Sequence, residues 1–530
     1  MAGWAAVDRR TTPPMVTVPR EYNAAADFID RHLAEGRGAR LALVDGGGRY
    51  TYAEVGARVN RAGNALAALG VGMETRVAMC LLDTVDFPSV FWGALKAGAI
   101  PIPLNTLLRS KDYDYMLRDS RAHTLVVSGA LYEAFAPILE GQPFLRNVVV
   151  SGTGGDPRRP RLGDLMASAS PELTVAPTTA DDVAFWLYTS GSTGNPKGSM
   201  HLHSDIVHTV ALYALGVLDL RPDDVVFSAA KLFFAYGLGN AMTFPFYVGA
   251  TAILLAERPT PDAVLGILRS HEPTVFFGVP TLYGAILAEP GNDRSRGSPR
   301  LRVCVSAGEA LPEGVARAWE TRFGIQILDG LGSTEMLHIF LSNRAGEVRY
   351  GTTGTAVPGY ELRLVGEDGG VVPAGEMGEL CVRGPSSAVA YWNQREKSLD
   401  TFQGRWTRTG DKYVADAEGF YAYCGRTDDM LKVSGNWVSP FEVESALIEH
   451  EAVLEAAVVG HADERGLIKP KAFVVLKRPE AASDALAEEL KQFVKGRLAP
   501  YKYPRWLEFA PELPKTATGK IKRFLLRGAG

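Results

Sequence analysis

The chain has 530 residues, of which 46% are apolar and 22% charged, and its formal net charge is −4. Such a length exceeds one ordinary hydrophobic core, so we expect a globular protein of two or more domains. The small negative charge argues against nucleic acid or an anionic membrane as the main partner. The 4 cysteines form no C-x-x-C pair, so we expect neither a zinc site nor a disulfide framework.

The first fifteen residues give no sign of a targeting segment. Asp8, Arg9 and Arg10 stand where an apolar signal region would begin. No uncharged apolar run reaches the roughly 18 residues that a membrane span needs. We therefore expect a soluble, cytoplasmic protein without a membrane partner.

From about Leu41 to Pro358, apolar strand-like runs alternate with helix-like segments. The expected strands lie at 76–82, 123–129, 183–188, 250–255, 274–280 and 301–308. Near-continuous apolar strands separated by helices predict parallel or mixed sheets covered on both faces. The predicted fold class is therefore α/β, with a large N-terminal domain of mixed sheets flanked by helices.

The rest of the chain changes character twice. Shorter strands and turns from 359 predict a small β-rich subdomain, about 359–427. Beyond 425–440, helix-like segments at 441–450 and 486–498 and strands at 456–460 and 471–477 predict a small α+β C-terminal domain. We place the boundary near Asp428, which gives domains of 1–427 and 428–530.

The segment YTSGSTGNPKGS, Tyr188 to Ser199, is predicted to be a loop that holds polyphosphate. Its glycines let main-chain N–H groups approach a ligand, its hydroxyls donate hydrogen bonds, and Lys197 adds a positive charge. It is not a Walker A loop, because Gly198 follows the lysine. The alternative is a flexible surface loop, although Pro196 and Lys197 interrupt a linker-like composition.

Three further segments have chemical character. LDGLGSTE (328–335) is a second Gly/Ser/Thr loop that ends in Glu335, TRTGD (407–411) is a turn that ends in Asp411, and PKTATGK (514–520) ends in Lys520. Each alone is weak, because exposed charged residues are usually only solvated. Together with the first loop, in this order, they are a strong signal.

With these four segments, the sequence resembles the adenylate-forming superfamily of acyl-CoA synthetases, adenylation domains and luciferases, from roughly Tyr50 to Lys520. Within it, KLFFAYGLGN (231–240) and GSTEMLHIFLSN (332–343) are most similar to benzoate–CoA ligases. The resemblance implies a ligase that converts ATP, benzoate and CoA to benzoyl-CoA, AMP and diphosphate through an acyl-adenylate, with Mg²⁺. Displacement at phosphorus needs mainly positioning and charge neutralisation.

The resemblance also assigns roles around ATP. Thr334 would contact the α-phosphate, Glu335 would hold Mg²⁺, and Lys520 would bridge the α-phosphate and the substrate carboxylate. The β- and γ-phosphates would lie on Thr189, Ser190, Gly191, Ser192, Thr193, Gly194 and Lys197. The nucleoside would lie among Ser306, Ala307, Gly308, Glu309, Asp329, Gly330, Leu331, Asp411 and Arg426. Many relatives have tyrosine where this chain has Leu331, so apolar packing on adenine would replace aromatic stacking.

The same resemblance implies a pocket for the acid. Its wall would consist of Ala235, Tyr236, Gly332, His338 and Ile339. Flat, mostly apolar surfaces suit a phenyl ring. Tyr236 and His338 would limit ring size, which favours benzoate and small substituted benzoates. Whether Phe233 and Phe234 belong to this pocket or to the core stays open.

One active site must serve two half-reactions, and the resemblance implies that the C-terminal domain moves between them. Asp428 would be the hinge. Lys432, Ser434 and Gly435 would then border the pantetheine of CoA, and Tyr501 would contact its nucleotide end; packing is the alternative role of Tyr501.

Other functions remain open from the sequence. A medium-chain acyl-CoA synthetase shares every catalytic motif, and an adenylation enzyme that loads a carrier protein differs only in its acceptor. A non-catalytic nucleotide sensor is disfavoured by the intact Glu335, Asp411 and Lys520. A homodimer is likewise left open.

Overall fold

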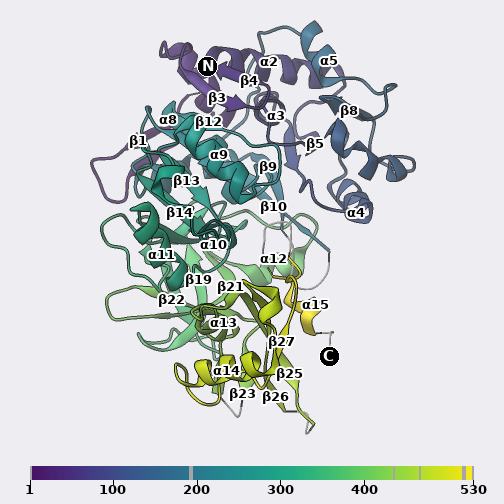
Figure 1. The fold of residues 1–530 in the computed structure, drawn as a ribbon. Helices are drawn as coiled ribbons and strands as arrows, with labels where there is room; N and C mark the ends of the chain where they lie inside the picture. Colours follow the sequence, from purple (N-terminus) through teal and green to yellow (C-terminus); the bar gives the residue numbers. More distant parts are fainter. Residues whose placement is uncertain (1–2, 190–194, 434–435, 465–466, 516–520, 528–530) are drawn as a thin grey trace.

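The structure, a computed structural model, describes residues 3–189, 195–433, 436–464, 467–515 and 521–527. Figure 1 shows the purple N-terminal elements at one end of the molecule and the yellow C-terminal elements at the other. None of the described helices combines the length and the apolar character that crossing a membrane requires.

The largest element is a nine-stranded mixed sheet with the order β17-β16-β15-β14-β13-β11-β12-β3-β4. Neighbours from β15 to β3 are parallel, and both edges are closed by antiparallel strands. The strands are β3 (Leu41–Asp45), β4 (Gly48–Thr51), β11 (Val225–Ser228), β12 (Thr251–Ile253), β13 (Val275–Gly278), β14 (Val303–Ala307), β15 (Ile327–Gly332), β16 (Ile339–Ser342) and β17 (Thr355–Ala356).

A second, four-stranded sheet is entirely parallel, in the order β6-β5-β7-β8. Its strands are β5 (Arg76–Cys80), β6 (Ile100–Pro103), β7 (Thr124–Ser128) and β8 (Asn147–Ser151). Each of them is almost wholly buried, as expected for parallel strands with both faces covered.

Helices cover these sheets in layers, which confirms the predicted α/β class. One buried cluster joins the outer face of the nine-stranded sheet to α9 (Pro261–His271), α10 (Pro280–Ala288) and α11 (Glu313–Phe323). A larger core holds α2 (Tyr52–Ala68) and α3 (Asp86–Lys96) together with side chains of both sheets, and a third cluster packs α4 (Ser110–Ser120) on the far face of the four-stranded sheet.

Helices α2 and α3 approach each other at two glycines. A Cβ at Gly93 would lie 2.7 Å from the carbonyl oxygen of Val59, and one at Gly63 would lie 2.8 Å from the carbonyl oxygen of Gly93. Such backbone-to-backbone contact leaves no room for a side chain, so glycine is required at both positions.

A five-stranded antiparallel sheet follows, and all of its strands lie inside the predicted 359–427 range. They are β18 (Glu361–Val365), β19 (Met377–Arg383), β20 (Phe402–Gln403), β21 (Trp406–Ala415) and β22 (Tyr421–Arg426). Helix α12 (Arg395–Thr401) lies between β19 and β20 in the chain and contacts β20 and β21.

The C-terminal part has its own three-stranded sheet of β25 (Val453–Ala462), β26 (Ile468–Leu476) and β27 (Trp506–Phe509). Helices α13 (Pro440–Ile448) and α14 (Asp484–Lys495) pack on one face, and α15 (Arg523–Arg527) packs on the other. A short hairpin, β23 (Leu431–Val433) and β24 (Asn436–Val438), precedes α13. The domain boundary at Asp428 stays a prediction.

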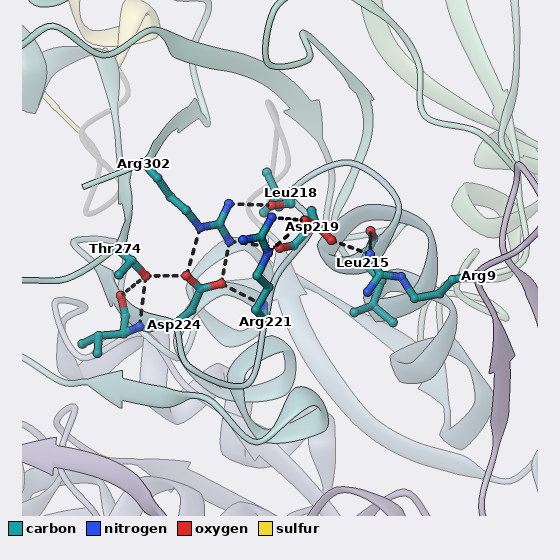
Figure 2. Close-up of polar contacts among 9 residues, drawn as sticks. Arg9, Leu215, Leu218, Asp219, Arg221, Asp224, Thr274 and Arg302 are labelled. Carbon is teal, nitrogen blue, oxygen red and sulfur yellow. Dashed lines mark hydrogen bonds and ion pairs between the residues drawn. The ribbon is translucent and has the colours of Figure 1, made fainter. Parts of the chain in front are cut away.

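A polar network fastens the amino ends of three parallel strands (Figure 2). Asp224, just before β11, accepts hydrogen bonds from Thr274 Oγ1 (2.6 Å) and from Arg302 Nε (3.0 Å) and Nη2 (2.5 Å). The network continues to the chain start, where Arg9 Nη2 lies 2.6 Å from Asp219 Oδ1. These groups lie at the amino ends of the strands, opposite the carboxyl ends where the site described below lies. We therefore assign them a role in stabilising the fold.

Three predicted loops are partly strand. The segment expected to be a loop from Tyr188 to Ser199 begins in β9 (Val183–Thr189) and ends in β10 (Lys197–Leu202), which pair antiparallel. Residues 328–332 belong to β15, and the expected turn 407–411 lies inside β21. The pairing of β19 with β21 shifts register between Glu379 and Cys381, so this last segment is an irregularity in a strand and not a turn.

Candidate functional site

One cavity of 1730 Å³ gathers most of the predicted site residues that the structure describes. It lies at the carboxyl ends of parallel strands β14 and β15, the usual place for ligands on such sheets, and it extends to the five-stranded sheet and the C-terminal part. The predicted residues on its wall are Thr189, Lys197, Gly308, Glu309, Asp329, Gly330, Leu331, Gly332, Thr334, Glu335, Asp411, Arg426 and Asp428.

The turn after β15 presents Thr334 and Glu335 to the cavity. His201 fixes this turn, because its Nε2 donates to the carbonyl oxygen of Thr334 (2.7 Å) while its Nδ1 lies 3.0 Å from Asp205 Oδ2. The carbonyl of Glu335 in turn accepts from Ala388 N at 2.7 Å. Both backbone groups are thus held by neighbouring elements, so the two side chains face the cavity from a fixed base.

Tyr391 connects the two charged groups of this wall. Its Oη donates to Glu335 Oε1 (2.6 Å), and Lys197 Nζ lies 4.1 Å from the centroid of its ring. Burial lowers the pKa of Lys197, and the nearby Glu335 carboxylate opposes that shift. The wall therefore offers one cation and one anion at neighbouring positions.

Asp411 and Arg426 form a second charged pair, across β21 and β22. Arg426 Nη1 lies 3.1 Å from Asp411 Oδ1 and also donates to the carbonyl oxygen of Thr409 (3.1 Å). The Asp411 charge is the main cause that raises the pKa of Arg426. Gly410 between them has φ 72°, and a Cβ there would lie 2.9 Å from Arg426 Nη2, so the pair depends on glycine.

Asp329 brings another carboxyl group to the wall. It is 6% exposed, and burial raises its pKa well above the ordinary value. Its neighbours Ser306 and Ala307, in β14, are buried behind the wall, and among the described residues Ser306 Oγ has no hydrogen-bond partner.

The residues predicted to enclose the acid divide into two groups. Gly332 lines the cavity, together with Phe233 and Phe234, which the sequence left between pocket and core. Ala235, Tyr236, His338 and Ile339 lie outside the described lining of the cavity; Tyr236 is half-buried and the other three are buried. The His338 ring centroid lies 5.7 Å from that of Tyr236 and 4.4 Å from that of Phe244.

His338 is a buried, uncharged group. Its Nε2 donates to Asn240 Oδ1 (3.0 Å), which leaves Nδ1 without a partner among the described residues. Burial lowers the pKa of His338 to about 3. The ring is therefore neutral at physiological pH.

The predicted hinge and CoA residues are placed unevenly. Asp428 lines the cavity, and its carbonyl oxygen accepts from Arg527 Nη2 (3.2 Å). Lys432 Nζ lies 5.3 Å from the ring of Trp437, and Tyr501 packs against the C-terminal core, so neither is in the described lining. Ser190, Gly191, Ser192, Thr193, Gly194, Ser434, Gly435 and Lys520 lie outside the described residues.

Sequence reasoning missed Tyr391, His201 and Lys397. Tyr391 and Lys397 line the cavity, and His201 holds Thr334 from behind. No local signal identifies Tyr391, because it lies 56 residues from its partner Glu335. Phe233 and Phe234 could have been predicted as lining residues, because they directly precede the predicted pocket residues Ala235 and Tyr236.

The wall suits a magnesium ion that arrives with a nucleotide. The described residues contain no group of three or more His, Cys, Asp or Glu side chains that could hold a metal by themselves. Mg²⁺ is usually bound by one or two carboxylates together with substrate phosphates. Glu335, beside a threonine and a lysine that can bind phosphate, fits that requirement.

Comparisons with known proteins agree with this geometry. The family described as AMP-binding enzyme matches residues 30–392, and the AMP-binding enzyme C-terminal domain matches residues 442–520. The chain is 59% identical over 524 residues to a benzoate–CoA ligase of Thauera aromatica, covering 98% of this chain and 99% of that one.

Two further proteins are similar along nearly the whole length. One is a 4-hydroxybenzoate–CoA/benzoate–CoA ligase of Rhodopseudomonas palustris, 52% identical over 96% of this chain and 94% of that one. The other is the crystal structure of a benzoate CoA ligase from Burkholderia xenovorans LB400, with a TM-score of 0.89 and 52% identity over 96% of this chain and 100% of that chain.

Proposed function

The chain belongs to the AMP-binding enzyme family, and we propose that it is an aryl carboxylate–CoA ligase that acts on benzoate. ATP and CoA are its co-substrates. The single observation that carries the proposal is the gathering of Lys197, Thr334, Glu335 and Asp411 on one cavity wall, in a chain 59% identical to a benzoate–CoA ligase.

The first half-reaction forms the acyl-adenylate. A carboxylate oxygen of benzoate attacks the α-phosphorus of ATP, and diphosphate leaves. Lys197 binds the outer phosphates and Thr334 donates to the α-phosphate, so negative charge is neutralised where it develops. Asp411, oriented by Arg426, accepts from the ribose hydroxyls. Mg²⁺ held by Glu335 would neutralise charge on the departing diphosphate.

The second half-reaction forms the thioester. The thiolate of CoA attacks the acyl carbon, the bond to the phosphate oxygen breaks, and AMP leaves. In our proposal Lys520 serves only the first half-reaction, and rotation about Asp428 replaces it with the segment that contains Lys432.

The acid preference rests on the side chains that line the cavity and lie next to it. Phe233, Phe234 and Tyr236 supply flat apolar surface, which suits a phenyl ring better than a flexible alkyl chain. The neutral His338 offers no charge to a second carboxylate. An aromatic monocarboxylate is therefore the best match.

A panel of acids tests the proposal. AMP release that needs ATP, CoA and the acid should be fastest with benzoate, slower with hydroxybenzoates, and slowest with hexanoate and octanoate. Faster turnover of the alkanoates would overturn the aromatic assignment in favour of a medium-chain enzyme. Benzoate-dependent exchange of diphosphate into ATP without thioester formation on free CoA would instead indicate a carrier-loading enzyme.

A further inference from the structure

Lys197 and Glu335 carry opposite charges on the same wall, yet the described structure contains no ion pair between them. Tyr391 occupies the position between the two. It donates from Oη to Glu335 Oε1 at 2.6 Å, and its ring face lies 4.1 Å from Lys197 Nζ. The tyrosine therefore donates a hydrogen bond to the Glu335 carboxylate through its hydroxyl and contacts the Lys197 ammonium group through its ring face.

Tyr391 is itself held rigidly. It is 4% exposed, its ring packs on Phe402 with centroids 5.2 Å apart, and its backbone N–H donates to Ser398 Oγ (3.0 Å). Its backbone also bridges to Ser199 in β10, the strand that begins at Lys197. The backbone of the tyrosine is thus joined to the strand that carries the lysine.

The next residue, Trp392, anchors this segment to the four-stranded sheet region. Its backbone N–H donates to Gly198 O (2.8 Å), its Nε1 donates to Asp119 O (2.8 Å), and its ring centroid lies 4.7 Å from that of Trp186. Contacts within the protein therefore hold the backbone beside the tyrosine.

We propose that Tyr391 is a positioning residue that keeps Lys197 and Glu335 as separate, ready charges until nucleotide and metal arrive. This inference rests on the proposed function, in which the lysine meets phosphate and the carboxylate meets Mg²⁺. Without the tyrosine, the flexible ammonium group can pair with the carboxylate, and that pair must break before Mg·ATP binds. Tyr391 engages only Oε1 of the carboxylate, and no other described residue donates a hydrogen bond to Oε2, the oxygen that would bind the metal.

Two substitutions separate the hydroxyl from the ring. In the full-length protein, Tyr391→Phe should raise the dissociation constant for Mg·ATP, measured by calorimetry, about tenfold. The dissociation constant for Mg-free ATP and the KM for benzoate should stay within about twofold of wild type. Tyr391→Leu removes the ring as well, so binding of ATP should weaken with and without Mg²⁺. In a Glu335→Gln background, Tyr391→Phe should have no further effect on Mg·ATP.

Tyr22→Phe is the matched control. Tyr22 Oη also donates to a carboxylate, Asp27 Oδ2 at 2.8 Å, and neither residue is in the described cavity lining. Its loss should lower the melting temperature without changing the ratio of the two ATP affinities.

The inference is wrong if Tyr391→Phe weakens the binding of Mg·ATP and of Mg-free ATP equally. It is also wrong if Tyr391→Phe lowers only the melting temperature, as Tyr22→Phe should. A full Tyr391→Phe effect that persists in Glu335→Gln also overturns the inference. Wild-type protein that binds no ATP would instead overturn the proposed function, so the two failures are distinguishable.

Discussion

Gly239 leaves the space that His338 occupies. It begins a helical turn, Gly239–Thr243, and a Cβ at this position would lie 2.3 Å from His338 Cδ2 and 2.6 Å from its Nε2. Gly239→Ala must therefore displace the imidazole ring. The ring cannot move freely, because Tyr213, Tyr236 and Phe244 pack around it.

The expected loss of stability follows from two contributions. Displacing the ring breaks the 3.0 Å hydrogen bond to Asn240 and leaves buried polar atoms unpaired, at a cost of about 1–3 kcal/mol. Forcing an extra methyl group into a packed interior costs about 1–3 kcal/mol more. Together they predict a decrease of about 2–6 kcal/mol in the free energy of unfolding.

Gly266→Ala is the control. Gly266 lies within helix α9, and a Cβ there would meet nothing within 4 Å. Alanine is favoured over glycine in a helix by about 1 kcal/mol, so this substitution should stabilise the protein.

Urea unfolding followed by circular dichroism measures both changes, and steady-state kinetics measures the KM for benzoate. Because His338 is a predicted pocket residue, we expect Gly239→Ala to raise that KM about tenfold, which corresponds to about 1.4 kcal/mol. If the two variants have equal stability, the steric argument is wrong. If Gly239→Ala loses stability but keeps the wild-type KM, His338 does not shape the acid pocket.

Three other outcomes are expected. Burial lowers the pKa of His203 from 6.5 to about 4. The unfolded chain therefore takes up the proton first, and the free energy of unfolding falls as pH drops from 6.5 towards 4. In urea titrations, His203→Gln should reduce the loss of unfolding free energy between pH 7.5 and pH 5 by about 2 kcal/mol. Asp224→Ala leaves Arg302 without its carboxylate partner and should cost about 3–5 kcal/mol in the same assay with unchanged KM values; a KM shift would contradict a purely structural network. Lys520→Ala should abolish benzoate-dependent diphosphate exchange while thioester formation from supplied benzoyl-adenylate continues, and equal loss of both half-reactions would refute its assignment to the first.

The sequence predicted the layered architecture well because buried parallel strands leave a strong local signal. The run 124–128 is wholly buried in the four-stranded sheet, and 303–307 is wholly buried in the nine-stranded one, as their unbroken apolar character indicated. Strands β5 and β13 likewise fall on the expected strands 76–82 and 274–280.

Loop limits were harder to predict because glycine and small hydroxyl residues also occur in strands whose pairing is tertiary. Lys197 to Ser199 form a strand only because β9 lies opposite, and 328–332 are strand only because β14 and β16 flank them. Local propensity carries no information about such partners.

The candidate site shows the same limit. Motifs identified Thr334, Glu335, Asp411 and Arg426, which line the cavity. Tyr391 and His201 act through contacts with residues 56 and 133 positions away, and no spacing rule reveals such contacts.

The link from Arg9 to the strand-end network makes the opening segment part of the framework. Beyond its ion pair with Asp219, Arg9 donates to the carbonyl oxygen of Leu215, and Ala5 is 2% exposed with its N–H bonded to Asp27. Most protein termini fray unless they are tied down in this way. Trimming the first ten residues to aid purification would therefore remove structural ties from the large body of the enzyme, so shortened versions should begin no later than Gly3.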